Sequence, residues 1–459
     1  MKQHAFPAVA VLGLAFQLLS LPVFAGTEVV STKAGAQAST APSTEADDLW
    51  HRDTLLGELG GYRTKLSDHG IVITPLFTAE LMGNLGGGSG AGYSSGGVGR
   101  GLGYAGLLNV PVDVDLSKMV DGWKGATFHV NGLWTSGPGL SPPYLGDIGN
   151  TSNIQAYNTV RLQELWFQQT FLEEKLSLRV GEMAADAEFF TTSTGALFLN
   201  STFGAFTLLS ANLTNPYNPP SYPMAAPGVR LRAQPRSDVY VMAGIYDGNT
   251  ESQTANKHGT DFHLNSESGA AIFTEAGYLL NADHAERLQG AYKFGSFVHT
   301  HNWNSWQSQA AAAAGTGTKV SGGVDALLYG VIDQQVYRRG DAAISVYTRA
   351  GHGSADRNAV DWYVDGGFNF AGFVPDREKD VFGVAVTRSS FSGNYSDYQL
   401  TTGAAANPYV AETTIEATYR FQLTPWWTLQ PDYQHIFTPG GIDGAKDADV
   451  LGLRTSVAF

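Results

Sequence analysis

The chain contains no cysteine, and charged residues make up only 15% of its 459 positions. Without cysteine it can build neither a disulfide framework nor a thiolate metal site. Basic residues are also scarce, with 28 lysines and arginines against 42 aspartates and glutamates and a formal net charge of −14. Such an acidic balance disfavours nucleic acid as a partner. Soluble domains usually carry about 25% charged residues, so much of this surface differs from an ordinary charged one.

Long apolar runs are missing after the first 25 residues. A transmembrane helix needs roughly 18 or more consecutive apolar residues, and none follows. The N-terminus has the order of an export signal, with Lys2, an apolar stretch over 9–21 and small Ala25. We therefore expect a cleaved signal peptide over 1–25; a retained anchor is the alternative, although the stretch is short for a span. An exported chain of this kind is either soluble outside the cytoplasm or a membrane β-barrel.

The abundant residues favour β-structure. Glycine occupies 55 positions and aromatic residues account for 12%. From residue 71 onward, extended segments with apolar side chains at every second position alternate with turn-rich segments. In ETTIEATYRFQLT, for example, Ile415, Tyr419 and Phe421 alternate with Glu416 and Arg420. A period of two is that of a strand whose two faces meet different surroundings.

A soluble β-sandwich would also show this alternation, so the polar face is the discriminating feature. Here that face holds mostly Gln, Thr, Ser and Gly, which suits a water-filled lumen. Backbone groups in hydrocarbon must be paired internally, so strands cross a membrane only as a closed barrel. Residues 71–459 have room for about 16 strands of roughly 9–11 residues per crossing. The sequence therefore predicts an all-β protein, a transmembrane antiparallel β-barrel of about 16 strands.

Two segments are expected before the barrel. Residues 26–48 are small, polar and aperiodic, which is typical of a flexible leader. Over 49–70 we expect a short N-terminal helix, capped by Asp53 and interrupted by the glycine pair 60–61.

The last strand is also predicted from its pattern. The final segment DVLGLRTSVAF ends in Phe459, and one of its faces carries Leu451, Leu453, Thr455 and Val457. This face suits lipid, whereas the other face, which includes Arg454, suits water.

Several motifs, in order, resemble those of the OprB-type carbohydrate-selective porins of Gram-negative outer membranes. The resemblance runs from about 55 to 459. It is carried by GELGGYRTKLSDHGI, GNLGGG, DLSKMVDGWKGATFHV, RLQELWFQQTFLEEKLSLRVGEMAADAEFF, NPPSYPMAAPGVRLRAQP, AGIYDGN, EATYRFQLTPWWTLQPDYQHIFTPGG and GLRTSVAF. It implies a barrel of about sixteen strands through which glucose and related small sugars diffuse passively. Family members narrow the pore with loop and N-terminal material and line it with arginine, carboxylates and an aromatic ring. The terminal Phe459 resembles the signal that such barrels present to their assembly machinery.

Polar side chains on the matching motifs are the candidate pore-lining, sugar-binding residues. A sugar must exchange water for other hydrogen bonds of similar strength; guanidinium groups donate, carboxylates accept, and an aromatic face covers the C–H side of a pyranose. Glu164, Trp166 and Gln168 share one face of their strand, although a slip of one residue would move Trp166 to the membrane interface. The candidates are Arg100, Glu164, Trp166, Gln168, Arg179, Arg230 and Arg232.

Other interpretations stay open. The acidic balance is compatible with a general or cation-preferring porin. An outer-membrane barrel enzyme would need a nucleophile, a base and an orienting group, and we find no ordered signature of that kind. Glu182, Asp186 and Glu188 form either a solvated loop or an incidental cation site, and no motif for a metal or a cofactor is present.

Overall fold

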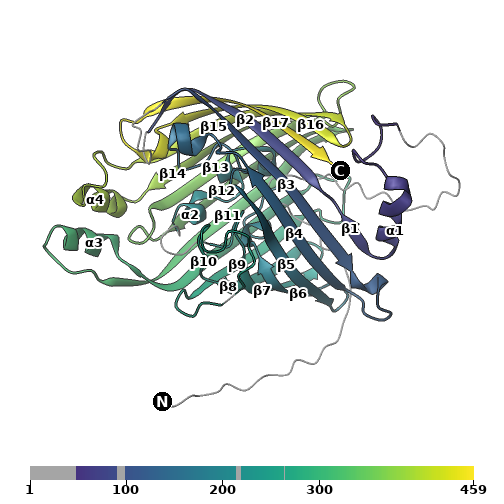
Figure 1. Ribbon diagram of the computed structural model, residues 1–459, viewed down its shortest axis with the longest axis horizontal. Helices are drawn as coiled ribbons and strands as arrows, with labels where there is room; N and C mark the ends of the chain where they lie inside the picture. Colours follow the sequence, from purple (N-terminus) through teal and green to yellow (C-terminus); the bar gives the residue numbers. More distant parts are fainter. Residues whose placement is uncertain (1–47, 90–98, 213–218, 263) are drawn as a thin grey trace, which may run out of the picture.

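Sixteen antiparallel strands form a closed barrel, as predicted (Figure 1). The computed structural model describes residues 48–89, 99–212, 219–262 and 264–459. Each strand pairs with its neighbours along the chain, and β17 pairs with β2 to close the cylinder. The strands are β2 (Leu76–Gly88), β3 (Gly101–Asp115), β4 (Ala126–Ser136), β5 (Thr159–Phe171), β6 (Leu176–Met183), β7 (Ala226–Arg236), β8 (Val239–Asp247), β9 (Ala270–Leu280), β10 (Gly290–Asn304), β11 (Ser321–Arg339), β12 (Ala342–Gly353), β13 (Val360–Ala371), β14 (Val381–Phe391), β15 (Ala411–Thr424), β16 (Trp427–Phe437) and β17 (Lys446–Ala458).

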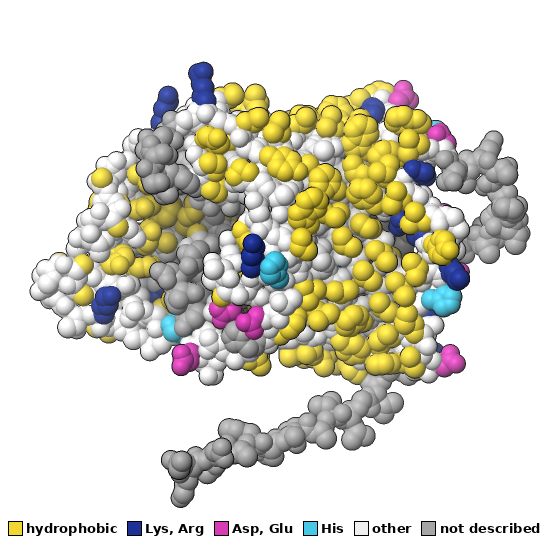
Figure 2. Space-filling view, in the orientation of Figure 1, with side chains coloured by type: hydrophobic (Ala, Val, Ile, Leu, Met, Phe, Trp, Pro, Cys, Tyr) yellow, Lys and Arg dark blue, Asp and Glu magenta, His cyan; other side chains and the backbone are white. Residues whose placement is uncertain are grey.

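Apolar side chains cover the outside of the barrel. Figure 2 shows a broad apolar band on the wall, with most charged groups beyond it. In β17, Leu451 and Leu453 are exposed on the outside whereas Arg454 is buried on the inside. An apolar band around closed strands is the surface that hydrocarbon requires.

The two ends of the barrel differ in their connections. The links 172–175, 237–238, 340–341 and 425–426 are short, whereas the links at the opposite end are mostly long and include helices α3 (Trp306–Ala313) and α4 (Gly393–Thr401). Outer-membrane barrels have short periplasmic turns and longer external loops. We therefore name the end with α3 and α4 the outer end, and the end with α1 and the C-terminus the periplasmic end (Figure 1).

No helix in the described part of the chain is long and apolar enough to span a membrane. Besides α3 and α4 there are α1 (Tyr62–Asp68) and α2 (Thr207–Ser210). Single helical turns lie at Leu59–Gly61, Leu116–Lys118, Ser141–Leu145, Ala185–Ala187, Gly195–Leu197, Ser201–Phe203 and Pro439–Gly441.

The N-terminal helix lies on the other side of the glycine pair from where we placed it. Residues around Asp53 form bends and turns, and α1 begins after Gly61, whose φ of +85° sets the turn into the helix. A left-handed conformation is easily reached only by glycine, so the pair starts the helix instead of ending one. The predicted signal peptide over 1–25 and almost all of the leader over 26–48 lie outside the described residues.

The segment before the barrel is bound to the end of the chain. Strand β1 (Ile71–Ile73) extends the sheet beside β3. The guanidinium of Arg63 donates to the carbonyl of Phe459 at 2.9 Å, and the N–H of Leu55 donates to Ala458 O at 2.8 Å. These contacts hold the N-terminal segment at the periplasmic rim.

A long link fills part of the barrel interior. We call residues 184–212, which follow β6, the inner loop. Its apolar side chains pack against inward aromatic residues of β8–β13 in one cluster that includes Phe189, Phe190, Phe206, Leu208, Tyr240, Phe273, Tyr329 and Tyr363. Wall side chains also hold its backbone: Glu275 accepts from Phe190 N at 2.8 Å, and Glu416 accepts from Asn200 N at 2.9 Å. The inner loop therefore narrows the lumen from the side of β8–β16.

Candidate functional site

Five neighbouring strands bring polar side chains to one level of the lumen, on β3 to β7. The register pairs Asp113 with His129 and His129 with Trp166 across β3, β4 and β5. It pairs Gln168 with Arg179 and Arg179 with Arg230 across β5, β6 and β7. Glu188 reaches the same place from the inner loop. We call Asp113, His129, Trp166, Gln168, Arg179, Arg230 and Glu188 the polar girdle.

A β-bulge aims the β5 side chains of the girdle inward. The pairing of β4 with β5 skips Gln163, because Asn131 pairs with Glu164 while Gly132 pairs with Leu162. Such an extra residue shifts the alternation of side chains by one position. Arg161 faces inward before the bulge, and Trp166 and Gln168 face inward after it. The expected shared face of Glu164, Trp166 and Gln168 is therefore inward.

One carboxylate joins the two central arginines. Glu188 Oε2 accepts from Arg230 Nε at 2.8 Å and lies 3.3 Å from Arg179 Nη1. Gln168 Oε1 also accepts from both arginines, at 3.1 Å from Arg179 Nε and 2.8 Å from Arg230 Nη2. Ser177 Oγ accepts from Arg230 Nη1 at 2.6 Å. Charge-assisted bonds of this kind fix the planes of both guanidinium groups.

The charge of Glu188 is secured by its partners. Burial alone raises the pKa of this carboxyl, but the guanidinium groups of Arg179 and Arg230 outweigh burial and lower the pKa to about 2. Glu188 is therefore ionised throughout the physiological range and always neutralises part of the arginine charge.

Trp166 lies between two flat groups. The ring of His129 stacks on it with centroids 4.5 Å apart and an interplanar angle of 13°, and the Arg179 guanidinium carbon lies 3.7 Å from the indole centroid. Strands β4 and β6 flank β5 on opposite sides, so these two groups approach the indole from its two faces. Only 7% of Trp166 is exposed.

Further polar groups continue the girdle towards the inner loop and the outer end. The Arg232 guanidinium lies 4.2 Å from the ring centroid of Tyr240, and the Tyr240 hydroxyl donates to Glu275 at 2.6 Å. Glu164 accepts from the N–H of Ala184, the first residue of the inner loop, at 3.0 Å. Arginine, carboxylate and aromatic groups thus alternate around this part of the lumen.

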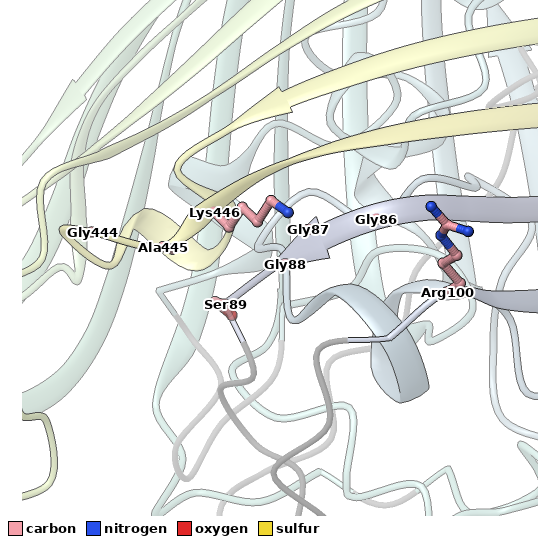
Figure 3. Close-up of a pocket in the computed structure, with 8 residues that line it drawn as sticks. All are labelled: Gly86, Gly87, Gly88, Ser89, Arg100, Gly444, Ala445 and Lys446. Carbon is pink, nitrogen blue, oxygen red and sulfur yellow. The ribbon is translucent and has the colours of Figure 1, made fainter.

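The structure brings together six of the seven candidate residues and leaves one apart. Glu164, Trp166, Gln168, Arg179 and Arg230 are in or against the girdle, and Arg232 is beside it. We expected Arg100 to reach into the lumen, but it does not. Its side chain is exposed, and its Nε donates to the carbonyl of outward-facing Leu85 at 2.9 Å. It lines a rim hollow of about 530 Å³ together with Gly86–Gly88 and Lys446 (Figure 3).

Sequence reasoning missed two girdle residues, Asp113 and His129, and left a third, Glu188, open between a solvated loop and an incidental cation site. Asp113 and His129 are joined by a 2.7 Å hydrogen bond and occupy polar positions of alternating strands, so the period of two was the signal that could have found them. Glu188 could not be placed, because only the fold of the inner loop brings it to Arg179 and Arg230.

The three acids predicted to form either a solvated loop or an incidental cation site have separate environments. Glu182 is buried on β6, Asp186 accepts from the N–H of Tyr222 at 2.9 Å, and Glu188 is bound to the arginines. Burial raises the pKa of Asp186 to about 7. Within the part of the chain that the structure describes, no group of three or more His, Asp or Glu residues could hold a metal ion.

Residues 99–459 match the family described as carbohydrate-selective porin, OprB family. The chain belongs to this family. Porin B of Pseudomonas aeruginosa is 25% identical over 449 residues. The match covers 93% of the present chain and 94% of Porin B. A putative porin of Acinetobacter baylyi, QuiX, is 23% identical over 446 residues, with 91% and 96% covered. The high-pH structure of Pseudomonas putida OprB superposes with a TM-score of 0.81 at 22% identity, covering 90% of this chain and 100% of that one, and so shows the same fold.

Family and fold together define the general role. The chain is a sugar-selective porin of the outer membrane, and both its family and its barrel are those of a channel and not of an enzyme. The expectation that the sequence holds no nucleophile signature is wrong for one pattern, because the letters GYSSG at 92–96 match GxSxG. These residues lie outside the described part of the chain.

Proposed function

We propose that this porin lets small neutral sugars such as glucose diffuse passively across the outer membrane, and that the polar girdle is its selective constriction. The observation that carries this proposal is the position of Glu188, which the inner loop places against Arg179 and Arg230 on strands β6 and β7. The lumen is narrowed at this point, and its lining offers donors and acceptors in fixed positions.

The chemistry of the girdle fits a solute rich in hydroxyl groups. Guanidinium groups supply donors, and Gln168, Glu164 and Glu188 supply acceptors, so a sugar can exchange water for bonds of comparable strength. These groups already bond to one another, which limits how tightly any one of them holds a solute. Selective passage needs contacts of this kind, favourable on entry but weak enough for release.

The charges at the constriction balance, although the chain as a whole carries −14. Arg179, Arg230 and Arg232 lie there with the acids Asp113, Glu164 and Glu188. A constriction of balanced charge does not favour small cations in the way that the net charge of the whole chain would suggest.

We propose three of the seven candidate residues, Glu164, Arg179 and Arg232, as direct contacts with sugar. Gln168 and Arg230, which are 2% and 1% exposed, hold these contacts in position. Trp166 belongs to the same constriction through Arg179, and Arg100 belongs to the outer rim.

Transport by reconstituted protein tests the function. Liposomes that contain the purified porin should admit glucose faster than amino acids of similar size, with protein-free liposomes as the control. Equal uptake rates for glucose and amino acids would show a general porin. In a separate channel recording across a salt gradient, a reversal potential set by cations would show a cation channel.

We further propose that the chain comprises a signal peptide (1–25), a leader (26–48), an N-terminal helical segment (49–70) and the barrel region (71–459). Supporting this division are the export pattern of the first 25 residues and the rim contacts of the N-terminal segment. N-terminal sequencing of the protein isolated from outer membranes should begin at Gly26; a sequence that begins at Met1 would disprove cleavage.

We also propose that the barrel assembly machinery recognises the last strand through Phe459. In the folded chain the carbonyl of this residue is bound by Arg63, so recognition would precede docking of the N-terminal segment. Phe459→Ala should reduce the amount of folded barrel in outer membranes, and an unchanged amount would exclude this role.

A further inference from the structure

The Trp166 indole stands where an aromatic ring would be expected to cover the apolar side of a sugar, but neither of its faces is open. His129 stacks on it at 4.5 Å and Arg179 lies over it at 3.7 Å, leaving 7% of the residue exposed. A pyranose could stack there only by displacing one of these groups. The face of the indole is therefore already used by the protein.

We propose that Trp166 is a positioning residue which holds the Arg179 guanidinium in the lumen, and that His129 and Asp113 support it from behind. The inference rests on the proposed sugar channel and deepens it, because it moves the contact with the sugar from the indole to the arginine. The role of the aromatic ring is then electrostatic and orienting.

The contacts of Arg179 explain why it needs this support. Its Nε donates to Gln168 and its Nη1 lies 3.3 Å from Glu188, while within the described residues its Nη2 has no hydrogen-bond partner. A cation over the face of tryptophan is attracted by the ring quadrupole, and the attraction grows when water is excluded. The indole thus fixes the plane of the guanidinium and leaves one donor for a sugar hydroxyl.

The support behind Trp166 is equally specific. The Nδ1 atom of His129 lies 2.7 Å from Asp113 Oδ1, which fixes the plane of the imidazole against the indole. Asp113, His129, Trp166 and Arg179 come from β3, β4, β5 and β6 in turn, so the stack spans four adjacent strands. Motion of the indole towards β4 is blocked, and Arg179 keeps a fixed surface to lie on.

Channel recordings in planar bilayers distinguish this role from a sugar platform. We expect Trp166→Leu to weaken glucose block of the ionic current roughly threefold to tenfold, as loss of a desolvated cation–π contact would. The same variant should shift the anion-to-cation permeability ratio towards cations, in the direction of Arg179→Ala, although tryptophan is uncharged. The double variant should match Arg179→Ala alone, because both substitutions act through one guanidinium.

Three further variants sharpen the test. Trp166→Phe keeps an aromatic face but removes the indole N–H and should retain most of the sugar block and the ion selectivity. His129→Ala uncovers one face of the indole and removes its support, so it should weaken sugar block. If the indole instead stacked on the sugar directly, this variant would bind sugar at least as well as the parent. Trp134→Leu removes a lipid-facing tryptophan of β4, which is 51% exposed, and should change neither property.

The outcomes are separable. A different result would show that the indole itself stacks on the sugar. In that case Trp166→Leu weakens sugar block but leaves the permeability ratio unchanged, and the loss of sugar block in the double variant equals the product of the losses in Trp166→Leu and Arg179→Ala. The proposal would then be wrong. A Trp166→Leu channel identical to the parent also overturns it. If the parent channel shows no sugar block, the proposed function fails, yet the permeability ratios still test the coupling of Trp166 to Arg179. Should the leucine variant not fold, Trp166→Phe and His129→Ala carry the test.

Discussion

Two walls of the barrel use inward-facing charge in different ways. On the wall from β9 to β16, charged side chains hold the backbone of the inner loop: Asp333 accepts from Thr194 N at 2.9 Å, and Arg349 donates to the carbonyls of Thr202 and Phe203 at 2.9 and 2.8 Å. On the wall from β3 to β7, the arginines bond to side chains at the edge of the narrowed lumen. The wall from β9 to β16 holds the backbone of the loop, whereas the wall from β3 to β7 binds the loop mainly through the Glu188 side chain and, in our proposal, meets the solute.

The type of an inward-facing residue does not reveal its role. Arg349 and Arg230 are both inward, both buried and both paired with an acid. The guanidinium of Arg349 is bound by Asp365 and by carbonyls of the inner loop. That of Arg230 is bound just as fully, but by the side chains of Gln168, Ser177 and Glu188. Substitutions on the wall from β9 to β16 should therefore mainly change stability, and those on the wall from β3 to β7 should mainly change selectivity.

The largest effect is expected from Arg349→Met. This change leaves Asp365 buried without its cation and several loop carbonyls without a donor, which should cost about 3–5 kcal/mol of unfolding free energy. Urea titration of the protein folded in lipid vesicles measures this loss, and open-channel noise should increase as the inner loop loosens.

Arg388→Met is the matched control, because Arg388 is exposed and donates to Thr413 Oγ1 at 3.0 Å. Equal unfolding free energies for the two variants would show that Arg349 does not hold the loop, and the comparison between the walls would fail.

A smaller loss is expected from Asp333→Asn. The Asp333 carboxylate accepts from the hydroxyl of Thr192 at 2.6 Å and from the N–H of Thr194 at 2.9 Å. An amide offers one acceptor oxygen and turns an N–H₂ towards these donors, so we expect a loss of about 1–3 kcal/mol. Asp341→Asn, in an exposed periplasmic turn, serves as the control in the same urea titration. Similar losses in both variants would contradict an anchoring role.

Asp186 should give the inner loop a pH-dependent stability. Its pKa is about 7 in the fold, against 3.8 for the free side chain, because burial disfavours the charged form. The folded state therefore binds more protons than the unfolded state between these values, and stability falls as pH rises through this window. Asp186→Asn should remove this dependence, which amounts to about 1.4 kcal/mol for each pH unit that separates the folded and unfolded pKa values. Unfolding at pH 5 and pH 8 compares parent and variant; equal slopes would show that Asp186 does not cause the dependence.

Much of the barrel could be predicted because strand patterning is local. The alternation around Ile415 and Leu453 follows from lipid on one side and water on the other, and closure follows from the need to pair every backbone group. The N-terminal helix was misplaced because Gly61 adopts positive φ at its start, whereas sequence patterns associate glycine with helix ends. The inner loop has no period at all, and its position depends on distant wall residues such as Glu416.

In the candidate site, too, the residues fixed by local spacing could be predicted, and those fixed by long-range pairing could not. Glu164, Trp166 and Gln168 lie on one strand, where spacing alone places them together. The meeting of Arg179 with Arg230 depends on how β6 pairs with β7 after a long connection, which spacing does not fix. Arg100 follows a glycine-rich stretch without alternation, so its direction could not be read from sequence.

The smallest effect that we predict on stability, and the clearest on selectivity, is that of Arg230→Ala. Arg230 holds Gln168 and Glu188 in place, so its loss should weaken sugar block of single-channel current about threefold to tenfold, as loss of one hydrogen bond of roughly 1 kcal/mol between the girdle and the sugar would. Arg230→Lys should not restore the block, because a lysine ammonium cannot reproduce the planar fork. Arg232→Ala, beside the girdle, should have a weaker effect. If Arg230→Ala instead destabilises the barrel as much as Arg349→Met while leaving sugar block intact, the wall from β3 to β7 is structural too, and the division of labour between the two walls is wrong.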